Sequence, residues 1–239
     1  MPLITTKELL LNAQKGGYAV CAFNMENMEM AQGILAAAKK LHAPVILQTT
    51  PSTIRYASLS LFHGIAAALA EDPEVVAALH LDHGDTVELA CSAVKDGYTS
   101  VMYDGSALPY EENLRNTQTV VGMAHRVNAS VEAELGRILR PETGGEAEDA
   151  EDEEDHAAYY TDPTVAKAFV EETGIDALAI AFGTAHGLYT KAPHLHFPII
   201  DQVKAQTGVP LVMHGGSGVS ADGFRTAITK GIRKINYYT

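Results

Sequence analysis

Three histidines occupy comparable positions in the sequence, because each lies at or just after the end of a short apolar run and directly before a glycine. They are His83 in HLDHG, His186 in GTAHG and His214 in HGGSG. A glycine lets the backbone turn sharply, so that the neighbouring side chain can point inward. Three imidazoles that meet with a fourth position open form a catalytic zinc arrangement. The sequence therefore predicts that these three side chains bind one Zn²⁺ ion.

An acidic residue precedes the first of these histidines. Asp82 is adjacent to His83, and the alternation of side chains along a strand places it on the same face as His80. A carboxylate close to a metal but not bound to it can transfer protons during a reaction. The alternative is that Asp82 orients a ligand histidine through a hydrogen bond.

A glycine- and serine-rich loop follows the third histidine. The segment HGGSGVSADGF leads into a predicted helix, and backbone amides at a helix N-terminus form an anion site. Asn236 and Thr239 could add side-chain donors to the same anion. The spacing Gly216-x-Gly218-x-x-Ala221 also matches a dinucleotide fingerprint, but it comes late in the chain and no acidic residue lies near position 236 to hold a ribose. We therefore expect a simple phosphate site.

Two further strands each carry ionisable side chains on one face. Glu132 and Glu134 share a face of one strand, and Lys234 and Asn236 share a face of another. If Asn236 faces the site, Lys234 points into the interior, where a charge must be paired. We expect Lys234 to pair with Glu132 or Glu134, either as a structural ion pair or with an electrostatic role beside the metal.

The elements that must position these residues alternate between short apolar runs and helical patterns. This alternation predicts parallel strands joined by helices, and eight strands favour a TIM (β/α)₈ barrel over a doubly wound open sheet. The chain stops at Thr239, just beyond the last strand, so the final helix of the barrel is expected to be missing. We predict one barrel domain over residues 1–239. The strands are expected at 19–23, 45–49, 75–82, 100–104, 130–135, 177–182, 210–213 and 232–236, and the helices at 26–41, 59–71, 86–96, 109–126, 163–173, 197–207 and 220–230.

Composition limits the class of protein. The 239 residues are 46% hydrophobic and 20% charged, which fits one globular core, and the net charge of −13 argues against a nucleic-acid partner. Nine carboxylates lie between Glu142 and Asp155, where a solvated loop is expected. The sequence has no membrane span or signal peptide and only two cysteines, so we expect a cytoplasmic protein. The outer helices of a barrel offer surfaces for a homodimer or homotetramer.

Six motifs occur in order along nearly the whole chain: AFNMEN at 22–27, HLDHG at 80–84, VEAELG at 131–136, GTAHG at 183–187, HGGSG at 214–218 and KINYYT at 234–239. Together they make the sequence resemble one family, the class II, zinc-dependent aldolases. One further segment, PVILQTTPST, is similar to the fructose-bisphosphate and tagatose-bisphosphate branch.

This resemblance implies an activity in carbohydrate metabolism such as glycolysis. The reaction would be the reversible aldol cleavage of a ketose bisphosphate, or a related ketose phosphate, to dihydroxyacetone phosphate and an aldehyde such as glyceraldehyde 3-phosphate. The resemblance implies Zn²⁺ on the three histidines, Asp82 as the proton-transfer group and Glu134 as a glutamate that can approach the metal. It also implies a monovalent cation, Na⁺ or K⁺, near the phosphate. The substrate-binding residues that it implies are Asn24, Thr50, Gly187, Gly215, Ser217, Asn236 and Thr239.

The acidic stretch corresponds, by the same resemblance, to a mobile loop after strand five, which we place at 137–160. GGEAED at 144–149 is similar to the family's GGxED signature but has one inserted residue. The catalytic carboxylate of the loop is therefore Glu146 or Glu148, with Asp149 as a further candidate. The family's arginine after strand eight has no counterpart in this sequence.

Three alternatives remain at the level of sequence. A Schiff-base aldolase would use Lys234 as its nucleophile, but it would leave the three histidines unexplained. A zinc hydrolase of the barrel type would need a His-x-His pair on the first strand, where AVCAFN has none. A non-catalytic sugar-phosphate-binding subunit would bind the ligand without turnover.

Overall fold

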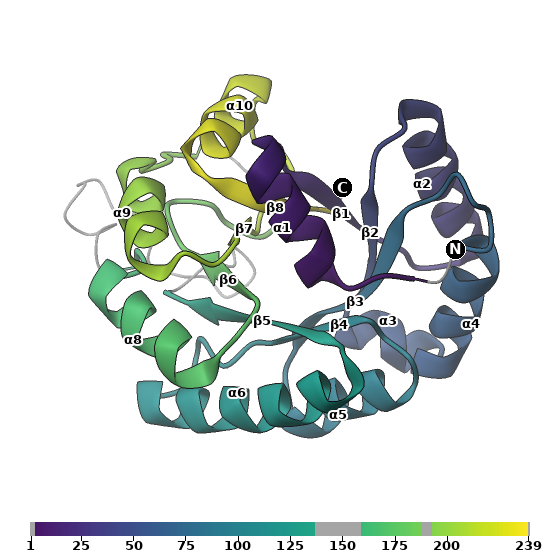
Figure 1. The fold of residues 1–239 in the computed structure, drawn as a ribbon, viewed down its shortest axis with the longest axis horizontal. Helices are drawn as coiled ribbons and strands as arrows, with labels where there is room; N and C mark the ends of the chain where they lie inside the picture. The colour runs from purple at the N-terminus through teal and green to yellow at the C-terminus, as the bar shows by residue number, and fades with distance from the viewer. Residues whose placement is uncertain (1–2, 137–158, 188–192, 239) are drawn as a thin grey trace.

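The computed structural model describes residues 3–136, 159–187 and 193–238, and its strands form a closed barrel (Figure 1). All strands are parallel and follow chain order, and β1 closes the barrel by pairing with β8. The predicted TIM barrel is confirmed, and the open sheet is ruled out. The strands are β1 Val20–Asn24, β2 Val45–Thr49, β3 Ala77–Gly84, β4 Ser100–Tyr103, β5 Ser130–Leu135, β6 Ala177–Ile180, β7 Leu211–Met213 and β8 Ile232–Tyr237.

Helices surround the barrel and pack on its outer face (Figure 1). Each predicted helix is present, with ends that differ by no more than two residues from the expected ones. Within the described residues no helix follows β8, as expected, and none is long and apolar enough to cross a membrane. The helices around the barrel are α2 Met28–Leu41, α3 Pro51–Tyr56, α4 Leu59–Leu69, α5 Val87–Lys95, α6 Tyr110–Ala124 with the 3₁₀ turn η1 His125–Val127, α8 Pro163–Thr173, α9 Pro198–Thr207 and α10 Ala221–Lys230.

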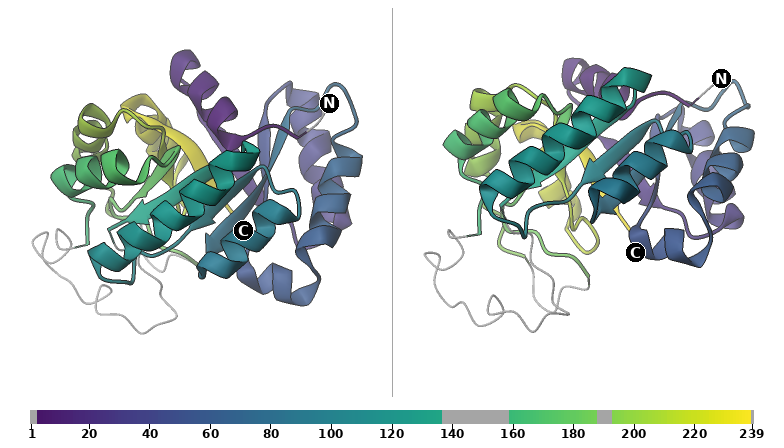
Figure 2. Two further views of the ribbon diagram at one scale, coloured as in Figure 1. Left: turned by 60° about the horizontal axis from the view of Figure 1, so that its bottom comes forward. Right: turned by 90° about the horizontal axis from the view of Figure 1, so that it is seen from below.

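The sequence prediction omitted two helices, the short α3 and α1 Thr6–Gly16, and α1 closes the N-terminal end of the barrel. Thr5 caps it by accepting a hydrogen bond from the Glu8 amide, and Gly17 ends it in the left-handed conformation. Leu9, Leu10 and Ala13 are buried against the barrel interior. Figure 2 shows α1 at one end of the barrel and the C-terminal end of β8 toward the other. The Thr-x-x-Glu pattern at Thr5 and Glu8 was the available signal.

The inward-facing side chains change character along the strands. Small and branched apolar residues, including Ala22, Ile46, Ala78 and Val212, fill the half of the interior next to α1. Two residues further along the same strands, the inward side chains are Asn24, Gln48, His80 and His214. The apolar half resembles an ordinary barrel core. The polar half therefore lies at the C-terminal ends of the strands, where barrel enzymes place their active sites.

The third strand is longer than predicted at its C-terminal end. We expected it at 75–82, whereas β3 covers Ala77–Gly84 and its pairing with β4 shifts register between Leu81 and Gly84. His83 lies in this irregular segment with φ of 50°, a left-handed conformation that is uncommon for a non-glycine residue. The bulge allows both Asp82 and His83 to face the same site from adjacent positions.

Candidate metal centre and active site

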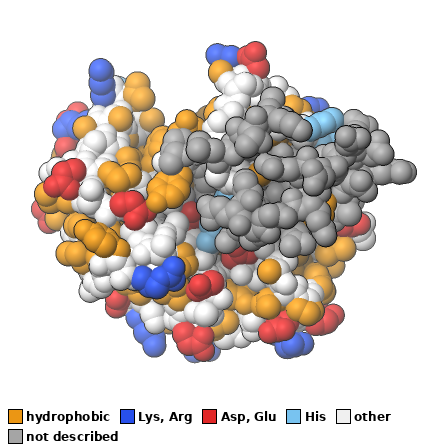
Figure 3. Space-filling view, turned by 180° about the vertical axis from the view of Figure 1, so that it is seen from behind, with side chains coloured by type: hydrophobic (Ala, Val, Ile, Leu, Met, Phe, Trp, Pro, Cys, Tyr) orange, Lys and Arg blue, Asp and Glu red, His pale blue; other side chains and the backbone are white. Residues whose placement is uncertain are grey.

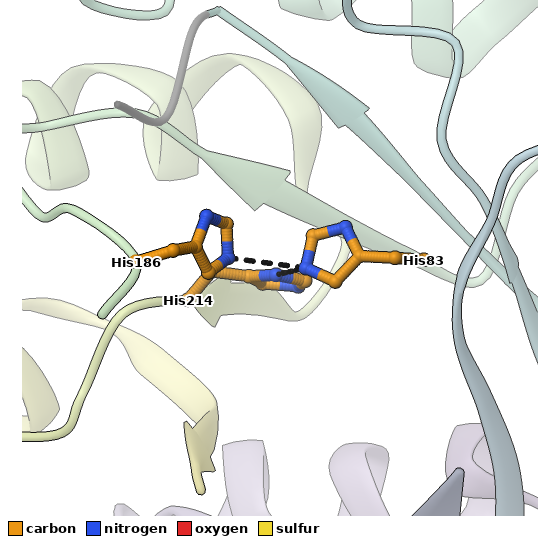
Figure 4. A group of neighbouring side chains, drawn as sticks. All are labelled: His83, His186 and His214. Carbon is orange, nitrogen blue, oxygen red and sulfur yellow. Dashed lines mark hydrogen bonds between the residues drawn. The ribbon is translucent and has the colours of Figure 1, made fainter. Parts of the chain in front are cut away.

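The three predicted histidines meet at the C-terminal end of the barrel. His83 comes from the end of β3, His186 from the segment after β6 and His214 from the residue after β7. The Nε2 atom of His83 lies 3.1 Å from Nε2 of His186 and 2.9 Å from Nδ1 of His214 (Figure 4). Figure 3 shows histidine side chains at the centre of the face opposite to that of Figure 1. Three strands distant in the sequence thus deliver ring nitrogens to one point.

Each ring has an inner nitrogen, which faces the other histidines, and an outer nitrogen, which faces away from them. A hydrogen bond donated by the outer nitrogen leaves the inner one free to bind a metal ion. Nδ1 of His83 donates to Asp104 Oδ2 at 2.8 Å, and Nε2 of His214 donates to Glu132 Oε1 at 2.9 Å. Their inner nitrogens are therefore free to direct lone pairs at one shared point, where a bound cation would stabilise both. Zn–N bonds of 2.0–2.1 Å in a tetrahedron place ligand nitrogens about 3.3 Å apart. The donor set therefore fits a divalent metal ion.

The carboxylates around the histidines favour positive charge at this point. Burial lowers the pKa of His83, but Asp82, the hydrogen bond to Asp104 and the charge of Glu134 outweigh it and raise that pKa to about 9. The pKa of His214 lies well below its usual value, because the ring is buried and His83 is close. The local field therefore attracts a cation to the inner nitrogens.

Glu134 lies beside the same point and is buried. Its Oε2 atom is 3.9 Å from Nδ1 of His214 and has no hydrogen-bond partner among the described residues. Burial, together with the charge of Asp104, raises the pKa of Glu134 to about 8. One oxygen from each of these carboxylates and a ring nitrogen of His83 lie within 4.8 Å of one another. Glu134 is thus placed where a carboxylate could approach a metal ion held by the histidines.

Asp82 is held in a separate hydrogen-bond arrangement at the edge of this group. Its Oδ2 accepts from Gln48 Nε2 at 3.1 Å and its Oδ1 accepts from Asn236 Nδ2 at 2.9 Å. The side chain is 4% exposed. The ligand-orienting bonds come from Asp104 and Glu132, so the described contacts of Asp82 do not match the orienting alternative. A fixed carboxylate adjacent to the three histidines remains available for proton transfer.

Sequence reasoning missed Asp104 and Gln48, which hold two of the functional side chains. Asp104 follows β4 directly and also accepts hydrogen bonds from the backbone amide and hydroxyl of Ser106. A carboxylate at the end of a barrel strand and before a glycine is the signal that could have identified Asp104. Gln48 occupies the inward face of β2 and is fully buried. Nothing in its spacing distinguishes Gln48 from other polar residues.

The predicted phosphate loop runs from β7 to α10 and packs closely on its neighbours. Gly215 has φ of 65°, and a Cβ there would clash with the Ala185 carbonyl oxygen. Gly216 donates its amide hydrogen to the Asn236 carbonyl at 3.1 Å. Ser217 Oγ accepts from the Tyr238 amide. The loop is thereby held between the segment that carries His186 and the end of β8, with Gly215 next to Ala185.

The structure describes one of the two predicted side-chain donors. The Asn236 side chain is buried on the inward face of β8, and its Nδ2 atom lies 2.9 Å from Asp82 Oδ1 and 3.3 Å from His214 Nε2. Its contact with an anion stays a prediction. Thr239 lies outside the described residues, as do Glu146, Glu148 and Asp149.

Of the predicted pocket residues, Asn24 is the last residue of β1 and Thr50 directly follows β2, at the same end of the barrel. Asn24 is buried, and its Oδ1 accepts from Gln48 Nε2 at 2.9 Å. Thr50 caps α3, and its hydroxyl accepts from the Thr53 amide. Both side chains are thus fixed by neighbours on the polar half of the barrel. The predicted loop at 137–160 lies outside the described residues, apart from its last two positions.

The predicted ion pair of Lys234 is confirmed, and its partner is Glu132. Nζ lies 2.7 Å from Glu132 Oε2, and both side chains are buried, at 0% and 1% exposed. Glu132 contacts Lys234 with one oxygen and His214 with the other. The ion pair therefore lies directly beneath one of the three histidines.

A family model described as class-II fructose-bisphosphate aldolase matches residues 4–239. The chain belongs to this family. Three solved structures of aldolases resemble it. The YdjI aldolase from Escherichia coli K12 is 36% identical, with a TM-score of 0.86, and the match covers 99% of this chain and 82% of that one.

Two further aldolases resemble the chain in the same way. A candidate fructose-1,6-bisphosphate aldolase from Coccidioides immitis is 32% identical, with a TM-score of 0.85, over 97% of this chain and 80% of that one. Fructose-bisphosphate aldolase from Campylobacter jejuni is 25% identical, with a TM-score of 0.80, over 100% of this chain and 77% of that one. Membership of the class II aldolase family and these neighbours support an aldolase, which is a lyase.

Proposed function

We propose that this class II aldolase is zinc-dependent and reversibly cleaves a ketose bisphosphate, or a related ketose phosphate, to dihydroxyacetone phosphate and an aldehyde. The observation that carries the proposal is the convergence of the inner nitrogens of His83, His186 and His214, with Nε2 of His83 only 3.1 Å and 2.9 Å from the other two. These three residues would hold Zn²⁺, which supplies Lewis acidity that stabilises negative charge on the ketone oxygen. Glu134 would approach the ion from the β5 side.

Asp82 is the group we assign to proton transfer on oxygen. During cleavage it takes the proton from the hydroxyl whose carbon becomes the aldehyde, and during condensation it returns that proton. Gln48 and Asn236 donate to its two oxygens, which fixes the carboxylate in place. Because hydrogen bonds fix both oxygens, little reorganisation is needed when the proton moves. A carboxylate of the loop after β5, Glu146 or Glu148, would exchange the proton on the carbon of dihydroxyacetone phosphate.

The loop from β7 to α10 is the site we assign to the phosphate. Its backbone amides around Gly215 and Ser217 lie next to Ala185 and precede the N-terminal end of α10, where the helix dipole favours an anion. Binding the phosphate there uses energy from a part of the substrate that does not react to position the part that does. A monovalent cation, Na⁺ or K⁺, would offset phosphate charge in the same region.

The geometry weighs against the Schiff-base alternative. A lysine that attacks a carbonyl must be neutral and must reach the substrate. Lys234 is fully buried, and its Nζ atom lies 2.7 Å from Glu132 Oε2 in an ion pair. Its Nζ also contacts His80 on the side away from the three histidines. The amine is therefore neither free nor presented at the rim.

Metal removal tests the proposal directly. Treatment with a chelator should abolish cleavage of fructose 1,6-bisphosphate or tagatose 1,6-bisphosphate, and added Zn²⁺ should restore it. Sodium borohydride added with substrate should not trap a covalent adduct. Full activity in the chelated protein, or a borohydride adduct at Lys234, would contradict zinc dependence. A protein that binds dihydroxyacetone phosphate but condenses it with no member of an aldehyde panel would instead be the non-catalytic subunit.

A further inference from the structure

A column of buried polar side chains runs along the barrel axis from α1 to the candidate metal centre. The five members of this axial column are Thr6, Ser100, His80, Lys234 and Glu132, and none is more than 2% exposed. Barrel interiors are usually filled with branched apolar side chains. Burying a lysine and a glutamate costs several kcal/mol per ion unless each is well paired. Because its burial is costly, we expect this column to have a function.

Glu132 connects the column to the centre by using one oxygen for each neighbour. Its Oε1 atom accepts from Nε2 of His214 at 2.9 Å, and its Oε2 atom accepts from Nζ of Lys234 at 2.7 Å. Lys234 also donates to Nε2 of His80 at 3.2 Å. An ammonium group only donates, so it determines the roles of both partners.

The hydrogen positions in the rest of the column follow from that starting point. Because Nε2 of His80 accepts, its Nδ1 must donate to Ser100 Oγ, which lies 2.7 Å away. Ser100 then donates to Thr6 Oγ1 at 2.7 Å, and Thr6 donates to Ser130 Oγ at 2.6 Å. Ser130 Oγ lies 3.3 Å from the Thr99 carbonyl, which can only accept. A donor-only group and an acceptor-only group thus fix one direction for the whole column.

The tautomer of His80 required by this direction agrees with its surroundings. Burial, together with the charge of Lys234, lowers the pKa of His80 well below its usual value. The ring is therefore neutral and can accept from Lys234 while donating to Ser100.

We propose that Glu132 and Lys234 are positioning residues that hold His214 with its proton on Nε2 and its lone pair on Nδ1, directed at the metal position, and that the axial column anchors this pair to α1. The inference rests on the proposed zinc site. Lys234 occupies one oxygen of Glu132, which leaves the other to accept from His214 alone. Neither residue touches substrate, and both act through the ring of His214.

Glu132→Gln tests this assignment because an amide has one acceptor oxygen instead of two. It cannot accept from His214 and Lys234 together, so one contact becomes a repulsion between donors. We expect the zinc dissociation constant, measured by competition with a chromophoric chelator, to rise at least about 10-fold, and the visible spectrum of the Co²⁺-loaded protein to change. Glu171→Gln, the same change at an exposed position of α8, should leave both unaltered.

Rescue distinguishes positioning from a structural role. Combining Lys234→Met with Glu132→Gln removes the competing donor, so the amide oxygen can accept from His214 and zinc affinity should return toward that of the wild-type protein. Thr6→Val interrupts the column at α1 and should lower the urea midpoint of unfolding without changing zinc affinity. The proposal would be overturned if zinc affinity fell in proportion to the urea midpoint of unfolding across all these variants. Unchanged zinc affinity in Glu132→Gln would also overturn it.

A measurement on the unmutated protein covers the case in which Glu132→Gln does not fold. In metal-free protein labelled with ¹⁵N-histidine, the His214 signal, assigned by its loss in His214→Gln, should report a proton on Nε2 and none on Nδ1. The opposite tautomer would overturn the proposal. Failure of the wild-type protein to bind zinc would instead refute the proposed function, so the two failures are distinguishable.

Discussion

Asn236 donates from Nδ2 to Asp82 Oδ1 over 2.9 Å and so joins β8 to β3 beside the three histidines. One layer deeper, Lys234 on β8 makes the equivalent contact to His80 on β3. The alternation of both strands therefore produces two stacked polar layers. The upper layer holds the carboxylate that we assign to proton transfer, and the lower layer holds the pair beneath His214.

Asp82→Ala should separate turnover from metal binding. We expect kcat for ketose bisphosphate cleavage to fall by about 10²–10⁴-fold, which is the usual contribution of a general acid or base, while zinc content stays at the wild-type value. The matched control is Asp85→Ala, which removes an exposed carboxylate three residues later. Steady-state kinetics and elemental analysis of the purified proteins are the measurements. A near-normal cleavage rate in Asp82→Ala would refute the proton-transfer assignment.

His83→Ala should remove metal and activity together, because Nε2 of His83 is common to both short nitrogen contacts at the centre. After dialysis we expect much less than one zinc ion per protein chain, and cleavage activity should be lost in parallel. His42→Asn provides a control, since His42 is exposed and ends α2 in the left-handed conformation that asparagine also tolerates. Retention of stoichiometric zinc by His83→Ala would show that the ion binds elsewhere.

Much of the barrel follows from the sequence because its determinants are local. Short aliphatic runs, the Asp-Pro start at Asp162 and the closing glycine at Gly174 specify α8 without reference to distant residues. The convergence of the three histidines also follows, since parallel strands deliver their C-terminal ends to one rim. The ion pair of Lys234 was predictable because an inward charge must find a partner.

The remaining features depend on three-dimensional packing that spacing alone does not specify. α1 is held by burial of Leu9 and Leu10 against strands far along the chain, so its role as a plug is a tertiary effect. The hydrogen bond from Asn236 to Asp82 was not predicted, because the acceptor that an inward amide meets depends on the strand opposite. The position of Asp104 at a strand end could have marked it as a site residue, but its partner, the ring of His83, is set by tertiary packing.

Gly215→Ala should disturb the phosphate loop, because a Cβ there meets the Ala185 carbonyl oxygen. Gly208→Ala is a closely matched control. Gly208 has φ of 70° against 65° at Gly215, and a Cβ at Gly208 meets nothing within 4 Å. Both variants incur the left-handed strain of about 1–2 kcal/mol in unfolding free energy. Only Gly215→Ala should raise KM for the ketose phosphate, by about 10-fold or more. Equal KM values in the two variants would contradict the assignment of this loop to the phosphate.

Leu10→Ala and Leu11→Ala test whether α1 contributes to the stability of the barrel. Leu10 is fully buried against the apolar half of the interior, whereas its neighbour Leu11 is 39% exposed. Truncating a buried leucine costs about 2–5 kcal/mol in unfolding free energy, because apolar contacts are lost and a cavity remains. We expect Leu10→Ala to lose that amount and Leu11→Ala to lose less than about 1 kcal/mol, as measured by urea unfolding. Similar losses in both would mean that α1 packs on the barrel through a different face.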